Sequence, residues 1–188
     1  MREETYRAFI AVDLPEGIKN RIGGLADQID MEGIRTVQER QMHITMVFIG
    51  SVKESDTAKI TEALSAVSCK PFEISVKGVS AITRERPRVI FAGLDRGANE
   101  LSGMRRNIVE GLRNSGIKLY REHGAFQPHI TIARVKGPQN LGKVSAFIDS
   151  HLNDEIGSFQ CSEIKLKRSV LSGDGPEHYD VFTKRLEA

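Results

Sequence analysis

The sequence predicts an α+β fold built from two related lobes. Apolar residues repeatedly change from the two-residue period of a strand to the 3.6-residue period of a helix, and the order of these segments in the first half recurs in the second. With 188 residues, of which 39% are hydrophobic and 28% charged, the chain can bury one substantial core. We therefore expect a single bilobal domain over residues 1–188, with halves of approximately 1–83 and 84–188 related by a pseudo-twofold axis. An exchange of the first and last strands between the lobes is compatible with this arrangement.

The first half is predicted to contain three strands and two helices. Short apolar or alternating runs mark the strands, and apolar residues at helical spacing mark the helices. A proline can open a helix, and a serine can cap one. In chain order the elements are a strand at 7–13, a helix after Pro15, a strand at 41–49, a helix that Ser55 can cap, and a strand at 72–76.

The second half repeats this order and adds a final strand. Its first helix is followed by Gly116, which occupies a position typical of a helix C-cap. A glycine-proline turn separates the last two strands. In chain order the elements are a strand at 89–94, a helix at 101–112, a strand at 129–135, a helix at 141–148, a strand at 163–171, the turn at 173–176 and a strand at 179–186.

The two halves also share a short motif in their second predicted strands. His43-Ile44-Thr45-Met46 in the first half matches His129-Ile130-Thr131-Ile132 in the second, 86 positions later. Two such matches exceed what chance gives in a chain with five histidines. A pseudo-twofold axis would bring equivalent strands of the two halves together. We therefore expect the two histidines to meet at one site.

Each motif can supply one imidazole and one hydroxyl on the same face of its strand, because successive strand side chains alternate. Imidazole has an ordinary pKa of about 6.5, so at neutral pH one histidine of a pair can act as a base and the other as an acid. Such a pair can hydrolyse a phosphodiester. One histidine takes a proton from water, the other protonates the departing ribose oxygen, and Thr45 and Thr131 hold the nonbridging phosphate oxygens. The scheme requires no metal or other cofactor.

Other interpretations of these motifs remain open. A single strand histidine is most often a buried, hydrogen-bonded structural residue, although the duplication argues against this here. A zinc site needs three or four clustered ligands, and neither motif has a carboxylate or Cys at ligand spacing. Gly137–Val144 matches the G-x-x-x-x-G-K pattern of a phosphate-binding loop, but it lacks the following Ser or Thr, and a Gly-Pro turn into a helix also explains it.

Several residues near the motifs are weaker candidates for substrate contacts. Arg134 is five positions after His129 and would face away from it in a regular strand, so it reaches the phosphate only if the strand bulges. Phe126 could stack on a nucleobase, and so could Tyr179, although core packing is the commoner role of such aromatic residues. We expect the remaining histidines to be ordinary surface or loop residues: His123, His151 and His178.

Four segments of the chain form a recognisable set: Arg7–Leu14, Met42–Gly50, Phe126–Arg134, and Gly175-Pro176 with Tyr179. Together they resemble the 2H phosphoesterase superfamily, and within it the RNA 2′,3′-cyclic phosphodiesterases, also called 2′-5′ RNA ligases. The resemblance implies two antiparallel sheets flanked by helices, with both motifs lining a central groove. It also implies that His43 donates a proton to the leaving 3′ oxygen and that His129 accepts a proton from water, which leaves a 2′-phosphate. Ligation through a 2′-5′ bond would be the reverse use of the same groups.

Composition and charge limit the compartment and the partners. Cys69 and Cys161 are too few and too far apart for a disulfide framework, and the amino-terminal residues match neither a signal peptide nor a membrane span. We therefore expect a cytoplasmic protein with reduced thiols. A net charge of +2 gives little long-range attraction for a polyanion, so any RNA contact needs a local basic patch. We expect a monomer that acts on RNA or oligonucleotides ending in a 2′,3′-cyclic phosphate. The alternatives are a non-catalytic protein that binds RNA ends and a phosphate-loop nucleotide hydrolase.

Overall fold

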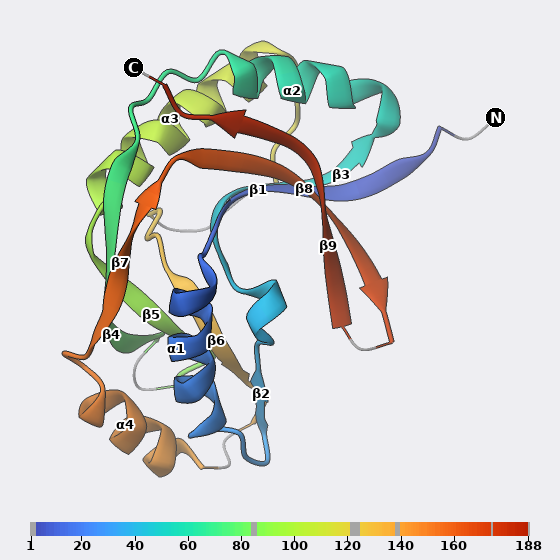
Figure 1. Cartoon of the computed structure of the whole chain (residues 1–188). Coiled ribbons are helices and arrows are strands. Elements are labelled where there is room, and N and C mark those ends of the chain that lie inside the picture. The colour runs from blue at the N-terminus through green and yellow to red at the C-terminus, as the bar shows by residue number, and fades with distance from the viewer. Residues whose placement is uncertain (1–2, 84–85, 121–124, 138–139, 174, 188) are drawn as a thin grey trace.

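The computed structural model describes residues 3–83, 86–120, 125–137, 140–173 and 175–187 (Figure 1). The strands within these ranges are β1 (Thr5–Asp13), β2 (Ile34–Thr36), β3 (His43–Lys53), β4 (Phe72–Ile82), β5 (Val89–Arg96), β6 (Ile130–Val135), β7 (Glu155–Cys161), β8 (Glu163–Ser172) and β9 (Gly175–Arg185). The helices are α1 (Glu16–Asp27), α2 (Thr57–Ser65), α3 (Ala98–Asn114) and α4 (Leu141–Ser150), with 3-10 turns η1 (Glu39–Gln41) and η2 (Glu54–Asp56).

The strands form a bent antiparallel sheet in the order β7-β4-β5-β6-β3-β1-β8-β9, with β2 also paired to β6. The expected α+β class with antiparallel strands is confirmed. The two sheets expected from the sequence are continuous, because β3 and β6 are joined through the single residue pair Ile44 and Ile130. Figure 1 shows how the strands on either side of this junction turn away from each other. The junction is the narrowest part of the sheet and lies at the centre of both motifs.

Strand pairing crosses the boundary between the two expected halves. β4 belongs to the first half of the sequence but pairs with β5 and β7. β8 belongs to the second half but pairs with β1, and β9 follows it at the edge of the sheet. The strands on each side of the β3–β6 junction therefore come from both halves of the sequence. This exchange of strands joins the amino-terminal and carboxyl-terminal segments in one core.

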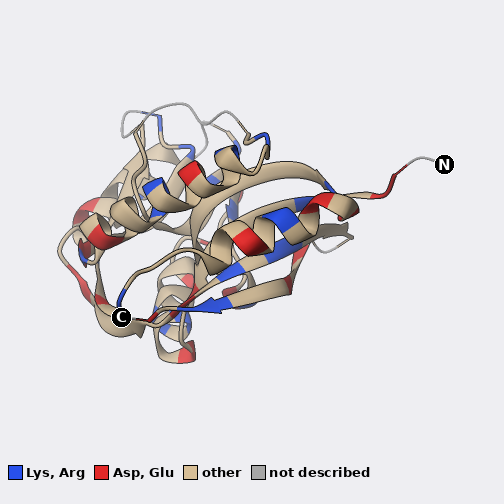
Figure 2. Cartoon of the chain, turned by 90° about the horizontal axis from the view of Figure 1, so that it is seen from above, with Lys and Arg blue, Asp and Glu red and all other residues tan. Residues whose placement is uncertain are grey.

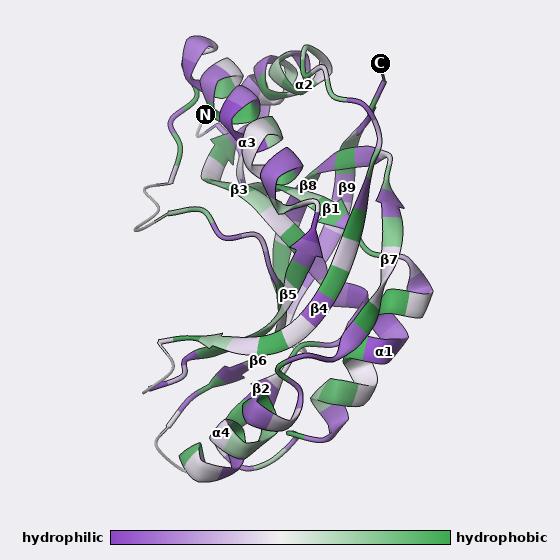
Figure 3. Cartoon of the chain, turned by 90° about the vertical axis from the view of Figure 1, so that its left-hand side faces the viewer, coloured by the Kyte–Doolittle hydropathy of each residue, from purple (hydrophilic) through white to green (hydrophobic). Residues whose placement is uncertain are grey.

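The helices cover opposite ends of the bent sheet. α2 packs on α3, which contacts β3 and β5, whereas α1 contacts β6 and β7, and α4 contacts β4. Figures 1 and 3 show α2 and α3 together at one end of the molecule and α1 and α4 toward the other. The apolar stripes predicted from the sequence are the buried faces of these helices: Ile18, Ile22, Leu25 and Ala26 in α1, and Leu101, Met104, Ile108 and Leu112 in α3.

The structure tests two helix-capping predictions, one at the end of α3 and one at the start of α2. Gly116 follows α3 with a φ of +76°, its N–H donates to the carbonyl of Arg113, and the N–H of Ile117 donates to the carbonyl of Leu112. These are the hydrogen bonds of a Schellman motif, so the prediction for Gly116 is confirmed. The prediction for Ser55 is wrong, because η2 delays the start of α2 and the Ser55 hydroxyl instead donates to the Glu3 carboxylate.

Two strands were not predicted from the sequence. β2 is only three residues long and is held by its pairing with β6. In β7 only Ile156 and Cys161 are buried among seven residues, so the strand lacks a regular apolar alternation. It forms because β4 pairs with it along its length, and this partner cannot be recognised from the local sequence.

Candidate active site

The pair that joins β3 to β6 brings the two motifs side by side. Ile44 and Ile130 are directly opposed and both are fully buried. Opposed residues of an antiparallel pair point to the same face, and their neighbours along each strand point to the other face. That other face, which we call the histidine face, carries His43, Thr45, His129 and Thr131. Continuing the register makes the two histidines diagonal neighbours, whose Cα atoms are typically about 7 to 8 Å apart.

Matching hydrogen bonds hold the two motif histidines. Nδ1 of His43 lies 2.7 Å from the carbonyl oxygen of Gln41, and Nδ1 of His129 lies 2.8 Å from that of Gln127. A carbonyl oxygen can only accept a hydrogen bond, so Nδ1 carries the hydrogen in both rings. The other nitrogen, Nε2, is therefore the atom that can take up or give up a proton.

A buried phenylalanine packs against each of these rings. The ring centroids of Phe9, in β1, and His43 are 4.9 Å apart, and those of Phe91, in β5, and His129 are 5.1 Å apart. Both phenylalanines are only 4% exposed. The hydrogen bond and the aromatic contact together restrain each imidazole before a substrate binds.

A register shift in β3 brings Phe48 onto the histidine face. Met46 is an extra residue between the pairs formed by Ala11 and Ile10, and Phe48 then pairs with Phe9. Strict alternation would have turned Phe48, five residues after the motif histidine, to the opposite face. The side chain of Phe48 is 47% exposed, and its ring centroid lies 6.3 Å from that of Phe9. The alternation along the sequence therefore does not indicate Phe48 as a residue of this face.

An equivalent shift in β6 brings Arg134 onto the same face. Ile132 is the extra residue there, and Arg134 pairs with Val89. Val89 lies two positions before Phe91 in β5, and Phe91 packs on His129, so these side chains share one face. The bulge on which any phosphate contact of Arg134 depends is present, and its side chain is exposed.

The carbonyls of the two extra residues are satisfied from outside their strands. The Nε–H of Arg105, in α3, donates to the Met46 carbonyl at 2.9 Å, and the backbone N–H of Val37 donates to the Ile132 carbonyl at 2.8 Å. The Arg105 guanidinium also lies 4.8 Å from the centroid of the Phe126 ring, which is partly buried against the core. The structure therefore places Phe126 at the sheet junction, in contact with Arg105.

The prediction that His178 is an ordinary surface or loop residue is wrong. His178 lies in β9, with its ring centroid 5.2 Å from that of His43 and 4.8 Å from that of Phe9, both in edge-to-face geometry. The hairpin of β8 and β9 carries it to the histidine face, because β8 pairs with β1. The predicted glycine-proline turn indicates that hairpin, but no local signal indicates that it lies beside His43.

Two lysines and two aspartates form a lysine–aspartate cluster on the same face. Lys167 is 7% exposed and lies 2.9 Å from Asp13 and 2.6 Å from Asp180, while Lys165 lies 3.0 Å and 2.8 Å from the same two carboxylates. Burial favours the protonated form of Asp180, but hydrogen bonds from Lys165 and Lys167 outweigh it and lower the Asp180 pKa. The hydrogen bond that the Lys165 ammonium donates to Asp180 is the main reason that the pKa of Lys165 is raised. Asp13 pairs directly with His43, so the cluster borders that histidine.

The surroundings of His43 favour its neutral form. Burial is the main cause that lowers the pKa of His43 to about 4, and His178 and Lys167 act in the same direction. Burial, followed by the charge of Lys167, also lowers the pKa of His178. A phosphate anion against His43 would favour the imidazolium and raise its pKa again. The site can therefore couple the arrival of an anionic ester to the uptake of a proton.

Other sequence candidates lie away from this face or outside the described residues. Tyr179 alternates with His178 in β9, so it lies on the opposite face, where its hydroxyl donates to Glu177. His151 follows α4, and its Nδ1 lies 2.6 Å from the Asp154 carboxylate. His123 falls outside the described residues, as do two positions of the glycine-containing loop at 137–144.

Three further findings concern metal ligands, thiols and membrane spans. In the described part of the chain, no three His, Cys, Asp or Glu side chains are grouped so that they could hold a metal ion. Cys69 and Cys161 are free thiols, and burial raises the pKa of Cys161 to about 12. None of the described helices combines the length and the apolar character needed to cross a membrane.

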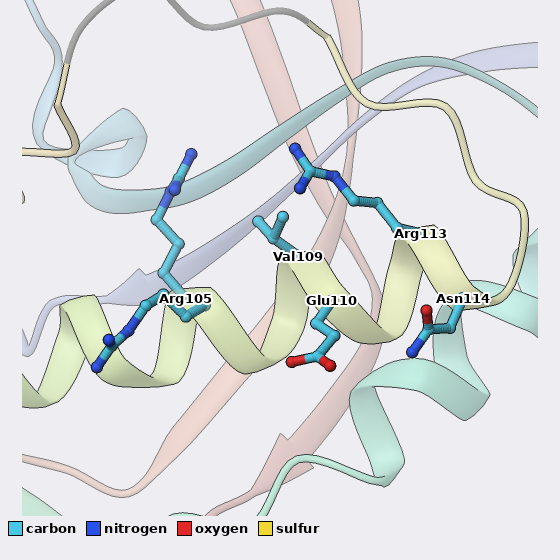
Figure 4. Close-up of a pocket in the computed structure, with 6 residues that line it drawn as sticks. Arg105, Val109, Glu110, Arg113 and Asn114 are labelled. Carbon is cyan, nitrogen blue, oxygen red and sulfur yellow. The ribbon is translucent and has the colours of Figure 1, made fainter.

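A hollow on α3 lies next to the sheet junction. It is lined by Arg105, Arg106, Val109, Glu110, Arg113 and Asn114. Figure 4 shows that Val109 and Arg113 project from one side of the helix and Glu110 from another. Charges of both signs are interspersed over the helices at this end of the molecule (Figure 2). Arg105 connects the hollow to the site, because it also contacts β3 and Phe126.

A family model and several known proteins that are similar in sequence indicate the same family. Residues 12–91 match the family described as LigT-like phosphoesterase. The RNA 2′,3′-cyclic phosphodiesterase of Aeropyrum pernix is 36% identical over 165 residues, which cover 86% of this chain and 93% of that protein. The protein of the same name from Methanothermobacter thermautotrophicus is 32% identical over 96% of this chain and 98% of its own length. The corresponding Methanocaldococcus jannaschii protein is 36% identical over 90% and 95%.

Solved structures share the fold. TT0787 of Thermus thermophilus matches with a TM-score of 0.79 and 23% identity, covering 96% of this chain and 97% of that one. Escherichia coli LigT in complex with 3′-AMP matches with a TM-score of 0.81 and 20% identity, covering 98% and 100%. Because both sequence identities are below 25%, these two matches show that the arrangement of helices and strands is shared, and no more.

Proposed function

Since the chain belongs to the LigT-like RNA 2′,3′-cyclic phosphodiesterase family of 2H phosphoesterases, we propose that it hydrolyses 2′,3′-cyclic phosphate ends of RNA, with His43 and His129 as its acid–base pair. The observation that carries the proposal is the Ile44–Ile130 pair, because it puts both motifs on one face of the sheet. Two imidazoles with the same tautomer and adjacent positions suit a phosphorus atom bound between them.

The reaction needs one proton acceptor and one proton donor. Nε2 of His129 takes a proton from water as the water oxygen attacks phosphorus. The bond from phosphorus to the ribose 3′ oxygen breaks, and Nε2 of His43 donates a proton to that oxygen, which leaves a 2′-phosphate and a 3′-hydroxyl. Thr45, Thr131 and Arg134 face the nonbridging oxygens, where hydroxyl and guanidinium donors stabilise the developing charge.

The lowered pKa of His43 fits the donor role once the substrate is bound. The free imidazole is neutral at pH 7, and the bound phosphodiester anion supplies the negative charge that favours its protonated form. An imidazolium that holds its proton weakly transfers it readily to the departing oxygen.

Single substitutions test the pair. His43→Ala and His129→Ala should each lower kcat for a nucleoside 2′,3′-cyclic phosphate by about 10²- to 10⁴-fold, the usual contribution of a positioned general acid or base. His151→Ala removes a histidine outside the site and should leave kcat unchanged, and an excess of chelator should not affect the wild-type rate. A full rate in either motif variant would rule out the two-histidine mechanism.

Product analysis separates the related activities. An oligonucleotide ending in a 2′,3′-cyclic phosphate should yield a terminal 2′-phosphate, and a 3′-phosphate product would reverse the proposed polarity. Adding an RNA with a 5′-hydroxyl end tests 2′-5′ joining, in which a ribose hydroxyl replaces water at the same groups. Binding of the RNA end without turnover would instead support a non-catalytic RNA-end-binding protein.

A further inference from the structure

The two motif histidines have matching local contacts but different neighbours. Each has a backbone carbonyl at Nδ1 and a phenylalanine against its ring. Within the part of the chain that the structure describes, only His43 of the two also contacts a second imidazole, that of His178, which comes from the last strand of the sheet. The site is therefore asymmetric on the His43 side, and the motif sequences themselves do not encode this difference.

We propose that His178 is a positioning residue of the active site, which clamps the His43 ring against Phe9 and makes the two motif histidines chemically unequal. This inference rests on the proposed function, because it assigns His178 to the same reaction. His178 transfers no proton in this proposal. It acts through the orientation and the surroundings of His43.

The geometry of three mutually contacting rings supports the clamp. The interplanar angle is 33° between Phe9 and His43, 71° between Phe9 and His178, and 78° between His43 and His178, and the three centroid distances are 4.9, 4.8 and 5.2 Å. These distances and the two edge-to-face angles lie within the range of favourable aromatic pairs. A rotation of the His43 ring would break at least one of these contacts and the hydrogen bond to Gln41. The clamp therefore fixes the direction in which Nε2 points.

Charged groups on three strands set the electrostatic surroundings of this clamp. Asp13 in β1 and Lys167 in β8 lie near both His43 and His178. Asp180 in β9 binds Lys167. The two lysines of the cluster neutralise Asp13, so this carboxylate cannot act as a strong partner for an imidazolium. His178 covers a further side of His43, which excludes water and places a second titratable ring beside it. Both effects favour the neutral form of His43 in the free protein, and the negative charge of the bound ester then favours its protonated form.

Kinetic measurements on two variants separate positioning from direct contact with the substrate. His178→Ala removes the clamp and should lower kcat by about tenfold or more, with a change in KM below about threefold. His178→Phe retains the ring contacts and should restore kcat to within about threefold of wild type. If His178→Phe were as defective as His178→Ala, the ring nitrogens would act directly and the positioning role would be excluded. His151→Ala is the matched control and should behave as wild type.

Titration of the His43 ring by NMR supplies a readout that does not depend on turnover. In the wild-type protein the midpoint should lie near 4, and in His178→Ala it should rise toward the ordinary histidine value of about 6.5, because water reaches the ring and the second imidazole is gone. His178→Phe should give a smaller rise, since it preserves the burial but not the titratable group. The limb of the pH–rate profile that depends on His43 should shift in the same order.

The outcomes separate this inference from the proposed function. An unchanged His43 titration and an unchanged kcat in folded His178→Ala would exclude the clamp, while activity lost in His43→Ala would still support the reaction. Full activity in His43→Ala would reject the proposed mechanism, yet a shifted His43 titration in His178→Ala would still show the contact. Circular dichroism of both His178 variants verifies that the overall secondary structure is retained.

Discussion

At the scale of single residues, one extra residue in each motif strand decides which side chains surround the histidines. The alternation of His and Thr indicates that each pair shares a face, and the register at Ile44 and Ile130 brings the pairs together. The same alternation places Phe48 and Arg134 on the wrong face, because it cannot anticipate the shifts at Met46 and Ile132. A bulge depends on the partner strand, so its position is not encoded by the local period.

Phe48 provides a test of these shifts. Its exposed ring on the histidine face can stack on the base of a bound nucleotide, a contact worth about 1–3 kcal/mol. We expect Phe48→Ala to raise KM for a nucleoside 2′,3′-cyclic phosphate by about tenfold, with kcat within about threefold of wild type. Steady-state kinetics at several substrate concentrations gives both values.

Tyr179→Ala is the matched control for this prediction. Tyr179 is 51% exposed, against 47% for Phe48, but it lies on the opposite face of β9 from His178. Its removal should leave KM unchanged. Equal effects of the two substitutions would show that exposure alone, rather than the face, determines the contribution.

At the scale of elements, α3 connects the first motif strand to the segment that leads into the second. The sequence predicts its buried stripe, and the structure confirms that stripe and the Gly116 end. The role of Arg105 was not predicted, because its partners are a bulge carbonyl in β3 and the ring of Phe126 before β6. A helical period identifies which face is apolar, but it does not identify polar contacts that depend on another strand's register.

Removing the Arg105 side chain should destabilise the fold. Arg105→Met leaves the carbonyl of the buried Met46 without its donor, which costs about 1–3 kcal/mol in the free energy of unfolding. Arg106→Met, on the exposed neighbouring position of α3, should change it by less than about 0.5 kcal/mol. Urea unfolding of both variants measures the difference, and similar values for the two would contradict a structural role of the Arg105 hydrogen bond.

At the scale of the whole molecule, the last two strands complete the first motif's surroundings. β8 supplies the two lysines of the lysine–aspartate cluster, and β9 supplies Asp180 and His178. These residues are more than 120 positions from His43 in the sequence and reach it only because β8 pairs with β1. The lysine–aspartate cluster, together with His43 and His178, also makes the stability of the fold depend on pH.

Stability should fall as the pH drops below about 6.5. The folded-state pKa values of His43 and His178 are lowered, so the unfolded chain binds protons that the folded chain does not, and the free energy of unfolding decreases through this window. His43 alone contributes a loss of about 3 kcal/mol when the pH reaches its folded pKa near 4. The lowered pKa of Asp180 acts at more acid pH, where its stabilisation is lost as the pH falls through its folded-state pKa.

Urea unfolding at several values between pH 7 and pH 4 measures this dependence. His43→Gln removes one titrating group, so its stability should decline less steeply than that of the wild type over the same range. Parallel curves for the two proteins would show that His43 is not held neutral by the fold.

The sequence by itself determined the repeated His-x-Thr strands, the buried helix faces and the family resemblance, because these depend on residue type and on short periods along the chain. Only the tertiary structure decided that β4 and β8 each pair with a strand of the other half. It also decided that Phe48 and Arg134 lie on the histidine face and that His178 lies against His43. Each of these depends on the register between strands distant in the sequence. That register is set by how the whole core packs, and no local stretch of residues carries it.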